Sequence, residues 1–417
     1  MVSLHDVFGI AEHVKKHSYV DRGGLDAQLH YLLGAERHIV MHGGSKQGKT
    51  WLRSRILAED SSILVQCQTG TTVESLLVDT LGMLGVRAEL RRTAGGDFEG
   101  KLDFKGSGSI GTHLLGKLGL EVATGGRGLR SERTETQPVG QAPGNLSWVA
   151  RTILASERRV VIEDCHYLAE TQLRDLAFVL KALGGYGVHV VVAGIWPQDH
   201  LLTYYNGDLS GRVDDVHLTW SDGDLDDVLR TGSRALKINM SSNLRDVLVA
   251  DAAGNVGLLQ QLAEAVCREE RIFDSSGGAQ YLTAGPSLER ARTAVANSMR
   301  PRFQAFAENF QEAATQVRPR VREPLAILQT LLDCDDAELQ RGVDSDLLVV
   351  RMMKLGHPRA RATAVGDLLE CLTETQAAMA VRPPVVTYNT HVGKAYLADQ
   401  SLLFFRRYGA PRWPWRT

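Results

Sequence analysis

Two short stretches of the sequence carry residue types that handle phosphate groups. The first is "GGSKQGKT", residues 43–50, which fits the pattern G-x-x-x-x-G-K-[ST] at every position. Glycines at both ends let the backbone wrap around a phosphate, with its N–H groups pointing inward. Lys49 adds a full positive charge, and Thr50 offers a hydroxyl ligand to Mg²⁺. The expected nucleotide-binding residues of this stretch are Gly43, Gly44, Ser45, Lys46, Gln47, Gly48, Lys49, Thr50 and Trp51.

The second stretch is "RRVVIEDCHYLAE", residues 158–170, in which an apolar run leads into two acids. At the end of a buried strand, one carboxylate can hold a Mg²⁺ ion and the next can orient or deprotonate a water. We assign Glu163 to the metal, together with Thr50, and Asp164 to the water. The alternative is that both acids only cap the helix that follows. His166 lies near this site or is a structural histidine.

An arginine completes the set of candidate catalytic residues. Arg212, in "DLSGRVDDVHL", lies directly before an apolar strand. In clustered ATPases an arginine at this place can reach the γ-phosphate of a neighbouring subunit. A surface arginine in a loop is the equal alternative. The candidate catalytic residues are therefore Lys49, Asp164, Glu163 and Arg212.

The elements around these residues alternate between strand and helix. The strands are "RHIVMHGG", "SSILVQC", "RRVVIE", "VHVVVAG" and "DDVHLTW", and helical patterns separate them. Their apolar centres predict an α/β fold with a parallel sheet covered on both faces. The P-loop then lies between a strand and an amphipathic helix, which is the context that it requires.

The pattern of elements divides the chain into four regions. Residues 1–220 form the α/β core, interrupted at 93–144 by a glycine-rich insert in which "KLDFKG" could pair as a hairpin. Residues 221–273 form a helical lid, 274–285 a linker, and 286–417 a helical C-terminal region. That region ends in two β-rich runs around a turn at 389–393, as in a winged helix, and Phe404 and Phe405 are expected in a core strand.

Composition excludes some classes of protein. The 417 residues are 43% apolar and 23% charged, with a net charge of −2, which argues against a nucleic-acid or membrane binder over its whole surface. No apolar run approaches the ~18–20 residues of a membrane helix, and the first residues do not read as a signal peptide. We expect a cytoplasmic protein with reduced, packed cysteines at positions 67, 165, 267, 334 and 371.

The two motifs, the strand "VVVAG", the "GRV" loop and the helical "GNVGLLQQLAEA" resemble the AAA+/STAND ATPases related to the origin-recognition and archaeal-ATPase groups. The resemblance covers roughly residues 17–270 without the insert. It implies a P-loop core with sheet order 5-1-4-3-2, and ATP or ADP with Mg²⁺ as cofactors. "YVDR" occupies the place of the adenine-pocket stretch, so Val20 and Arg22 are candidate base contacts. The tail "GKAYLADQSLLFFRR" is similar to the end of the winged-helix domains that follow such cores.

Departures from the family pattern favour a slow switch over a motor. "VVVAGIW" lacks the Asn or Thr that often senses the γ-phosphate, and residues 254–256 read Gly-Asn-Val where Gly-x-Pro is usual. No clear arginine of the lid senses the phosphate, and the acidic pair is inverted. We therefore expect ATP to control self-assembly or a protein partner. The resemblance places such proteins in bacterial stress or phage-defence modules.

Two other functions stay open. A DNA-binding ATPase, akin to replication initiators or transposition helpers, would use the basic and aromatic end of the chain. The residues that suggest it are Arg382, Lys394, Arg406, Arg407, Arg412, Arg416, Tyr408, Trp413 and Trp415. A tail docked on its own protein explains them better, because the expected recognition helix "VGDLLECLTETQ" is acidic. The remaining possibility is a degenerate P-loop that binds nucleotide structurally.

Overall fold

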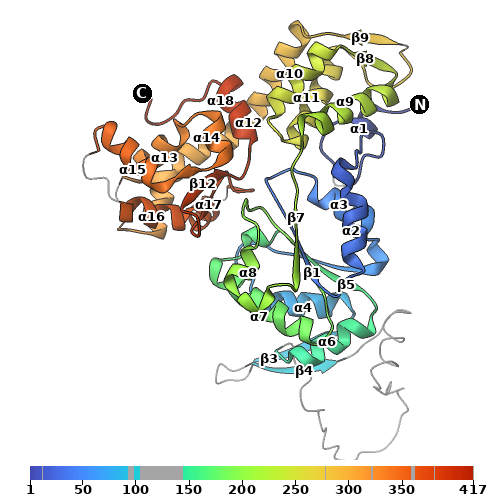
Figure 1. Ribbon diagram of the computed structural model, residues 1–417, viewed down its shortest axis with the longest axis vertical. Helices are drawn as coiled ribbons and strands as arrows, with labels where there is room; N and C mark the ends of the chain where they lie inside the picture. The colour runs from blue at the N-terminus through green and yellow to red at the C-terminus, as the bar shows by residue number, and fades with distance from the viewer. Residues whose placement is uncertain are drawn as a thin grey trace, which may run out of the picture.

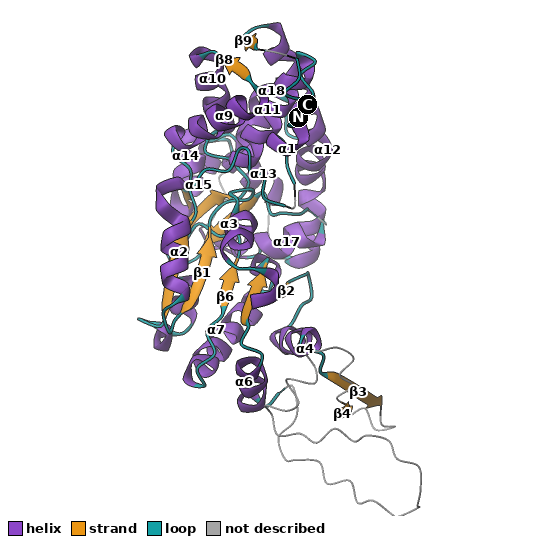
Figure 2. Cartoon of the chain, turned by 90° about the vertical axis from the view of Figure 1, so that its right-hand side faces the viewer, coloured by secondary structure: helices purple, strands orange, loops and turns teal. Residues whose placement is uncertain are grey.

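The computed structural model describes residues 1–11, 13–92, 98–103, 144–277, 279–320, 323–357, 362–379 and 381–416. A sheet domain occupies one end of an elongated molecule, and the helical residues 221–273, for which the predicted name lid is kept, occupy the other (Figures 1 and 2). A C-terminal region lies beside them, joined to the lid by a long helix (Figure 1). In the described part of the chain no helix is long and apolar enough to cross a membrane.

The central sheet has five parallel strands in the order β2-β5-β6-β1-β7. These strands are β1 (His38–His42), β2 (Ser62–Gln66), β5 (Arg159–Glu163), β6 (Val191–Ala193) and β7 (Val213–His217). Numbered along the chain and taken from the other edge, the order is 5-1-4-3-2. Both the predicted fold class and the predicted strand order are confirmed.

Helices cover both faces of this sheet and give it two separate apolar cores. Val40 of β1 belongs to one core, while Ile39 and Met41 point into the other, as the alternation of a strand requires. The helices on the Ile39 side are α2 (Leu25–Leu33) and α3 (Lys49–Ile56). Those on the Val40 side are α4 (Val73–Met83), α6 (Leu146–Ala155), α7 (Glu170–Gly185) and α8 (Leu201–Tyr205).

Short elements connect the parts of the core. They are the 3-10 turns η1 (Arg22–Gly24), η2 (Glu59–Ser61), η3 (Cys165–Tyr167) and η4 (Gly207–Leu209). Strands β3 (Arg87–Arg92) and β4 (Phe98–Asp103) form an antiparallel hairpin where the predicted insert begins. Residues 93–97 and 104–143 of the insert lie outside the described residues.

The lid and the C-terminal region share one continuous apolar core. The lid holds α9 (Asp222–Leu236), β8 (Ile238–Met240), α10 (Ser242–Ala252) and α11 (Val256–Glu269). The N-terminal helix α1 (Leu4–Val7) packs into the same core, so the first residues of the predicted α/β domain lie against the lid. Strand β9 (Gln280–Leu282), in the predicted linker, pairs in parallel with β8.

Helix α12 (Pro286–Val317) runs for 32 residues from the lid into the C-terminal region. The elements that follow it are α13 (Pro324–Leu332), α14 (Asp336–Arg341), β10 (Val343–Asp344), α15 (Ser345–Lys354), α16 (Ala362–Glu370), α17 (Leu372–Ala378), β11 (Val386–Asn389), β12 (Lys394–Leu397) and α18 (Ser401–Tyr408). Strands β10, β12 and β11 form a small antiparallel sheet. The segment predicted as one recognition helix is divided between α16 and α17.

The prediction of a core strand at Phe404 and Phe405 is wrong, because both residues lie in α18. Directly before this helix the Asp399 carboxylate accepts hydrogen bonds from the Ser401 amide and hydroxyl, a local arrangement that favours the start of a helix. The apolar run that follows is compatible with a buried strand and with a buried helix turn. All five cysteines are free and buried, as predicted.

Candidate functional site

The P-loop connects β1 to α3 and is built on two glycines that no other residue replaces without strain. Gly43 has φ 139°, and a Cβ atom there would lie 2.5 Å from the Leu218 carbonyl oxygen. Gly48 has φ 80° and caps the N-terminus of α3. The first N–H groups of α3 have no acceptor within the helix, so they face the loop interior with the positive end of the helix dipole.

Lys49 points back into the loop that it starts from. Its ammonium group donates to the Gly44 carbonyl oxygen at 2.7 Å and lies 3.4 Å from the Gly43 oxygen. Burial lowers the pKa of Lys49 to about 8, against the opposing attraction of Asp164. A partly buried ammonium group whose hydrogen bonds go to carbonyl oxygens alone is short of negative charge, which phosphate oxygens would supply.

The two acids after β5 have different surroundings. Glu163 Oε1 accepts from Arg53 Nε at 3.1 Å, and both side chains are only 7% exposed. Asp164 is half-exposed, has φ 60°, and faces the cleft that holds Lys49. Burial and then the charge of Glu163 raise the pKa of Asp164, while Lys49 lowers it. The expected metal ligand Glu163 therefore already neutralises an arginine, and the open carboxylate is Asp164.

His166 is buried, and neither ring nitrogen has a hydrogen-bond partner. Its ring lines the same cleft as the P-loop. Burial, followed by the positive charge of Lys49, lowers the pKa of His166 to about 3, so the ring is neutral near pH 7. A neutral imidazole without a partner can donate one hydrogen bond and accept another from a ligand.

A cleft of about 950 Å³ brings these groups together. Its walls come from the P-loop and the acidic pair, from Ile10 and His13 near the N-terminus, from Gln260 of the lid, and from Pro383 of the C-terminal region. All three parts of the molecule therefore contribute to one cavity.

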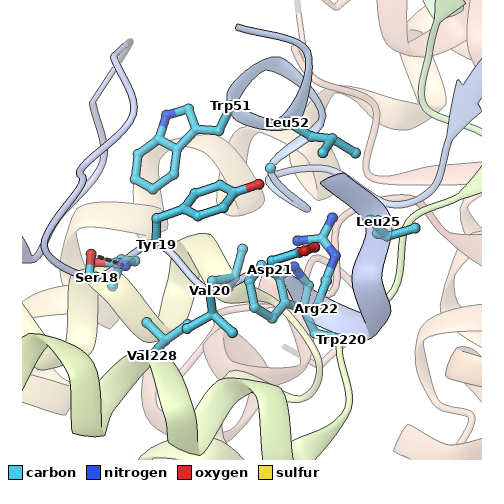
Figure 3. A pocket seen from close by; sticks show the side chains of 13 residues that line it. Ser18, Tyr19, Val20, Asp21, Arg22, Leu25, Trp51, Leu52, Trp220 and Val228 are labelled. Atoms are coloured by element: carbon cyan, nitrogen blue, oxygen red, sulfur yellow. Dashed lines mark hydrogen bonds between the residues drawn. The ribbon is translucent and has the colours of Figure 1, made fainter. Parts of the chain in front are cut away.

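A smaller pocket lies beside the cleft, with Gly48 lining both, and contains the two predicted base contacts (Figure 3). Val20 forms part of its apolar wall, with Tyr19 and Trp51 above it in the view. Arg22 stacks on the Trp220 ring at 4.1 Å and donates from Nη2 to the Gln47 carbonyl oxygen at 2.7 Å. The free space is about 30 Å³, close to one water's share of the liquid, so a nucleobase needs these side chains to move apart.

The outer face of the P-loop is held by the other two parts of the molecule. The Ser45 amide donates to the Ala398 carbonyl oxygen at 2.7 Å, between β12 and α18. Gln47 Nε2 donates to the Gly254 oxygen at 2.9 Å, and the Gly257 amide donates to the Lys46 oxygen at 3.2 Å. Three successive residues of the loop thus each contact the lid or the C-terminal region.

The structure brings all but one of the predicted site residues together. Arg212 is exposed and directly precedes β7. It therefore lies at the end of the sheet where the parallel strands begin, whereas the P-loop and this chain's own phosphate cleft lie where the strands end. Sequence reasoning missed Arg53, Trp220 and Ala398. A basic residue one turn after Lys49 on α3 was the available signal for Arg53, whereas a backbone carbonyl such as that of Ala398 leaves none.

Comparisons with solved structures concern the fold. A Walker-type ATPase of Pyrococcus abyssi superposes with a TM-score of 0.52 at 14% identity, over 94% of this chain and 97% of the other. The Orc1 protein of Aeropyrum pernix, in complex with DNA, gives a TM-score of 0.38 at 11% identity over 93% and 91% of the two chains. The RuvB Holliday junction branch migration motor of Thermotoga maritima gives 0.36 at 9% identity over 92% of each.

The likeness to the Pyrococcus ATPase is one of fold. No model of a known protein family matches the sequence, and no curated protein does. The chain has the P-loop ATPase fold, with the strand order that the resemblance to the AAA+ group predicts.

Proposed function

We propose that this protein binds ATP with Mg²⁺, hydrolyses it slowly, and uses the bound nucleotide as a switch for self-assembly or a protein partner. The observation that carries the proposal is the attachment of Ser45, Lys46 and Gln47 to the lid and the C-terminal region. A P-loop rearranges around phosphates, so a change in the nucleotide would be felt at these contacts.

The residues present fit a Mg²⁺-nucleotide. The P-loop amides and Lys49 would hold the outer phosphates, and Thr50 is exposed to the cleft as a hydroxyl ligand for the ion. Glu163 has its Oε1 bound to Arg53, so Asp164 is the carboxylate better placed to meet the ion or its waters. The base would enter beside Val20 and Arg22, where apolar walls and an unpaired buried Arg22 Nε are available.

Slow hydrolysis follows from the same geometry. Asp164 would have to serve the ion as well as the attacking water, because Arg53 competes for Glu163. The end of β6 is followed by Gly194, Ile195 and Trp196, which offer no side-chain amide or hydroxyl to a γ-phosphate. We expect turnover well below the ~1–100 s⁻¹ of typical kinases. An arginine from a neighbouring chain, such as Arg212, would accelerate it on assembly.

We also propose that residues 286–417 act as a winged-helix-like domain that binds protein. DNA binding is the second candidate, and the basic end of the chain was its support. In the structure that end is docked on its own protein: Arg407 pairs with Asp336, Arg416 pairs with Asp333, and Trp413 is buried. These contacts leave little of the basic set free for phosphates and favour the protein partner.

The test is Mg²⁺-dependent binding and hydrolysis of ATP by the full chain, with light scattering to follow oligomer size. Lys49→Ala should weaken ATP binding at least 100-fold, whereas Asp164→Asn should keep binding and lose hydrolysis. Lys16→Ala removes an exposed lysine and serves as the matched control. Fast turnover stimulated by DNA would overturn the switch in favour of the DNA-binding alternative. Equal binding by the Lys49 and Lys16 variants would refute the proposed site.

A further inference from the structure

A second cluster of ligand-type side chains lies at the ends of β1 and β7, outside the phosphate cleft described above. His42 and His217 are the last residues of these neighbouring strands and face each other in register. Asp199 reaches them from the loop after β6. One ligand atom from each of these three residues lies within 4.8 Å of the other two. Asp215 of β7 adds a second carboxylate beside His42.

The atoms at the centre of this cluster lack partners. The His42 side chain is fully buried, and its Nδ1 lies 3.3 Å from the Trp196 carbonyl oxygen, which only accepts. This contact assigns the hydrogen to Nδ1 and leaves a lone pair on Nε2. Neither Nε2 of His42 nor the buried Oδ1 of Asp215 has a hydrogen-bond partner.

The ligand atoms of these side chains lie close together. His42 Nε2 lies 3.1 Å from Asp199 Oδ1 and 3.9 Å from Asp215 Oδ1, and His217 Nδ1 lies 3.5 Å from Asp199 Oδ1. The lone pairs of His42 Nε2, Asp199 Oδ1 and Asp215 Oδ1 repel each other unless a cation lies between them. In a tetrahedral zinc site with ligand bonds of ~2.0–2.2 Å, the ligand atoms are separated by roughly 3.3 Å, which is close to these distances.

A proton shared between these atoms is the simplest competing cation. Asp215 is held ready by a contact from its other oxygen, Oδ2, to His200 Nδ1 at 2.8 Å. Such outer contacts orient the ligands of metal sites.

We propose that His42, Asp199 and His217 bind one divalent transition metal ion of the zinc class, with Asp215 as the fourth ligand. Two imidazoles and two carboxylates suit Zn²⁺, Co²⁺ or Ni²⁺, whereas Mg²⁺ prefers a shell of oxygen atoms alone. The site is therefore distinct in chemistry from the Mg²⁺ expected at Thr50.

The ion would fix the base of the P-loop. His42 directly precedes Gly43, and the Leu218 amide, directly after His217, donates to the His42 carbonyl oxygen at 2.8 Å. Gly43 itself packs against the Leu218 carbonyl oxygen. A metal bond between the two histidines would join β1 and β7, and Asp199 would add the loop after β6. The phosphate loop would then start from a rigid edge.

The experiment uses the full chain, freed of any affinity tag, stripped with a chelator and titrated with Co²⁺ in the absence of nucleotide. We expect one ion per chain with the visible absorption of tetrahedral cobalt, displaced by one equivalent of Zn²⁺, and a raised melting temperature. Asp199→Asn and His217→Ala alter exposed side chains, so folding should be preserved, and each should weaken binding at least 10- to 100-fold.

His30→Ala is the matched control, because it removes one exposed imidazole from α2, away from the cluster. The unmodified chain and the His30 variant should bind alike. Thiolate-to-cobalt absorption would instead place the ion at cysteines and overturn the assignment, as would equal binding by the Asp199, His217 and His30 variants. Failure to bind Co²⁺ or Zn²⁺ at all would leave a shared proton as the cation. Because no nucleotide is present, none of these results depends on the proposed ATP switch.

Discussion

The sheet domain and the helical body above it are stabilised in different ways. The sheet domain has two apolar cores, one on each face of the five strands. The lid, α12 and the C-terminal region share a single core that also takes in α1. At the P-loop the two bodies meet through hydrogen bonds at Ser45, Lys46 and Gln47, with a net value of about 0.5–1.5 kcal/mol each. The P-loop therefore lies at the joint between the two bodies.

The largest expected effect is a loss of stability caused by a substitution in the core that the lid and the C-terminal region share. Phe306 of α12 is fully buried and packs edge-on against Phe310, so Phe306→Ala should lower the free energy of unfolding by about 3–5 kcal/mol. Phe178→Ala on α7, where the ring is 55% exposed, is the control and should cost little. Hydrogen exchange should show loss of protection in both lid and C-terminal region together. Loss confined to one of them would contradict a shared core.

The next effect concerns the contact between the Ala398 carbonyl oxygen and the P-loop, and the substitution removes no residue of either apolar core. Asp399 is buried and pairs with Arg302 of α12, which fixes the turn that carries the Ala398 carbonyl oxygen to the P-loop. Arg302→Ala leaves the Asp399 carboxylate without its cation, a change worth about 3 kcal/mol for a buried pair and less here because Arg302 is 24% exposed.

We expect faster release of ADP from the Arg302→Ala variant, followed with a fluorescent analogue. Arg300→Ala, a half-buried neighbour on the same helix that bonds to Asn297 rather than to Asp399, should release ADP at the normal rate. An unchanged rate in the Arg302 variant would mean that the Ala398 contact does not hold the loop.

The two bodies also differ in how much of their structure can be predicted from the sequence. The fixed positions of the P-loop are demanded by φ angles at Gly43 and Gly48 and by charge at Lys49, so the motif predicts its own geometry. The strand order is likewise confirmed. The Arg53–Glu163 pair joins residues 110 positions apart, and the cluster of His42, Asp199 and His217 draws on three separate segments. Neither the pair nor the cluster is marked by a local pattern in the sequence.

The C-terminal region was harder to predict for a different reason. Its apolar run at 402–405 fits strand and helix alike, and the local signal for a helix is confined to the two hydrogen bonds from Ser401 to Asp399. The joint itself is made largely by backbone groups, such as the Ala398 carbonyl and the Ser45 amide, which carry no side-chain signature. Arg212 remains a prediction, because its role requires a neighbouring chain.

A pH titration tests the effect of burial on Lys49, which belongs to the sheet domain. The pKa of Lys49 is about 8, below its usual 10.5, because burial disfavours the ammonium form. Between these values the unfolded chain binds more protons, so the free energy of unfolding of the nucleotide-free protein should rise with pH. Phosphate needs the ammonium form, so ADP affinity should fall by up to tenfold per pH unit above about pH 8.

Isothermal titration at pH 7, 8 and 9 measures this dependence of ADP affinity. Lys49→Arg stays protonated throughout and should lose the dependence. An ADP affinity that stays flat up to pH 9 in the unmodified protein would show that burial does not affect Lys49 as the structure implies.

The smallest expected effect concerns one hydrogen bond on the lid side of the joint. Gln47 Nε2 donates to the Gly254 carbonyl oxygen at 2.9 Å, while the Gln47 backbone oxygen, which Arg22 and Trp220 hold, is kept in any variant. Gln47→Ala should therefore change the rate of ADP release by about 2- to 10-fold, in line with the ~0.5–1.5 kcal/mol of one hydrogen bond. Gln68→Ala, an exposed glutamine outside the joint, is the control. If Gln47→Ala changes the rate of ADP release as much as Arg302→Ala does, the expected ranking is wrong. The lid rather than the C-terminal region would then make the stronger contact with the P-loop.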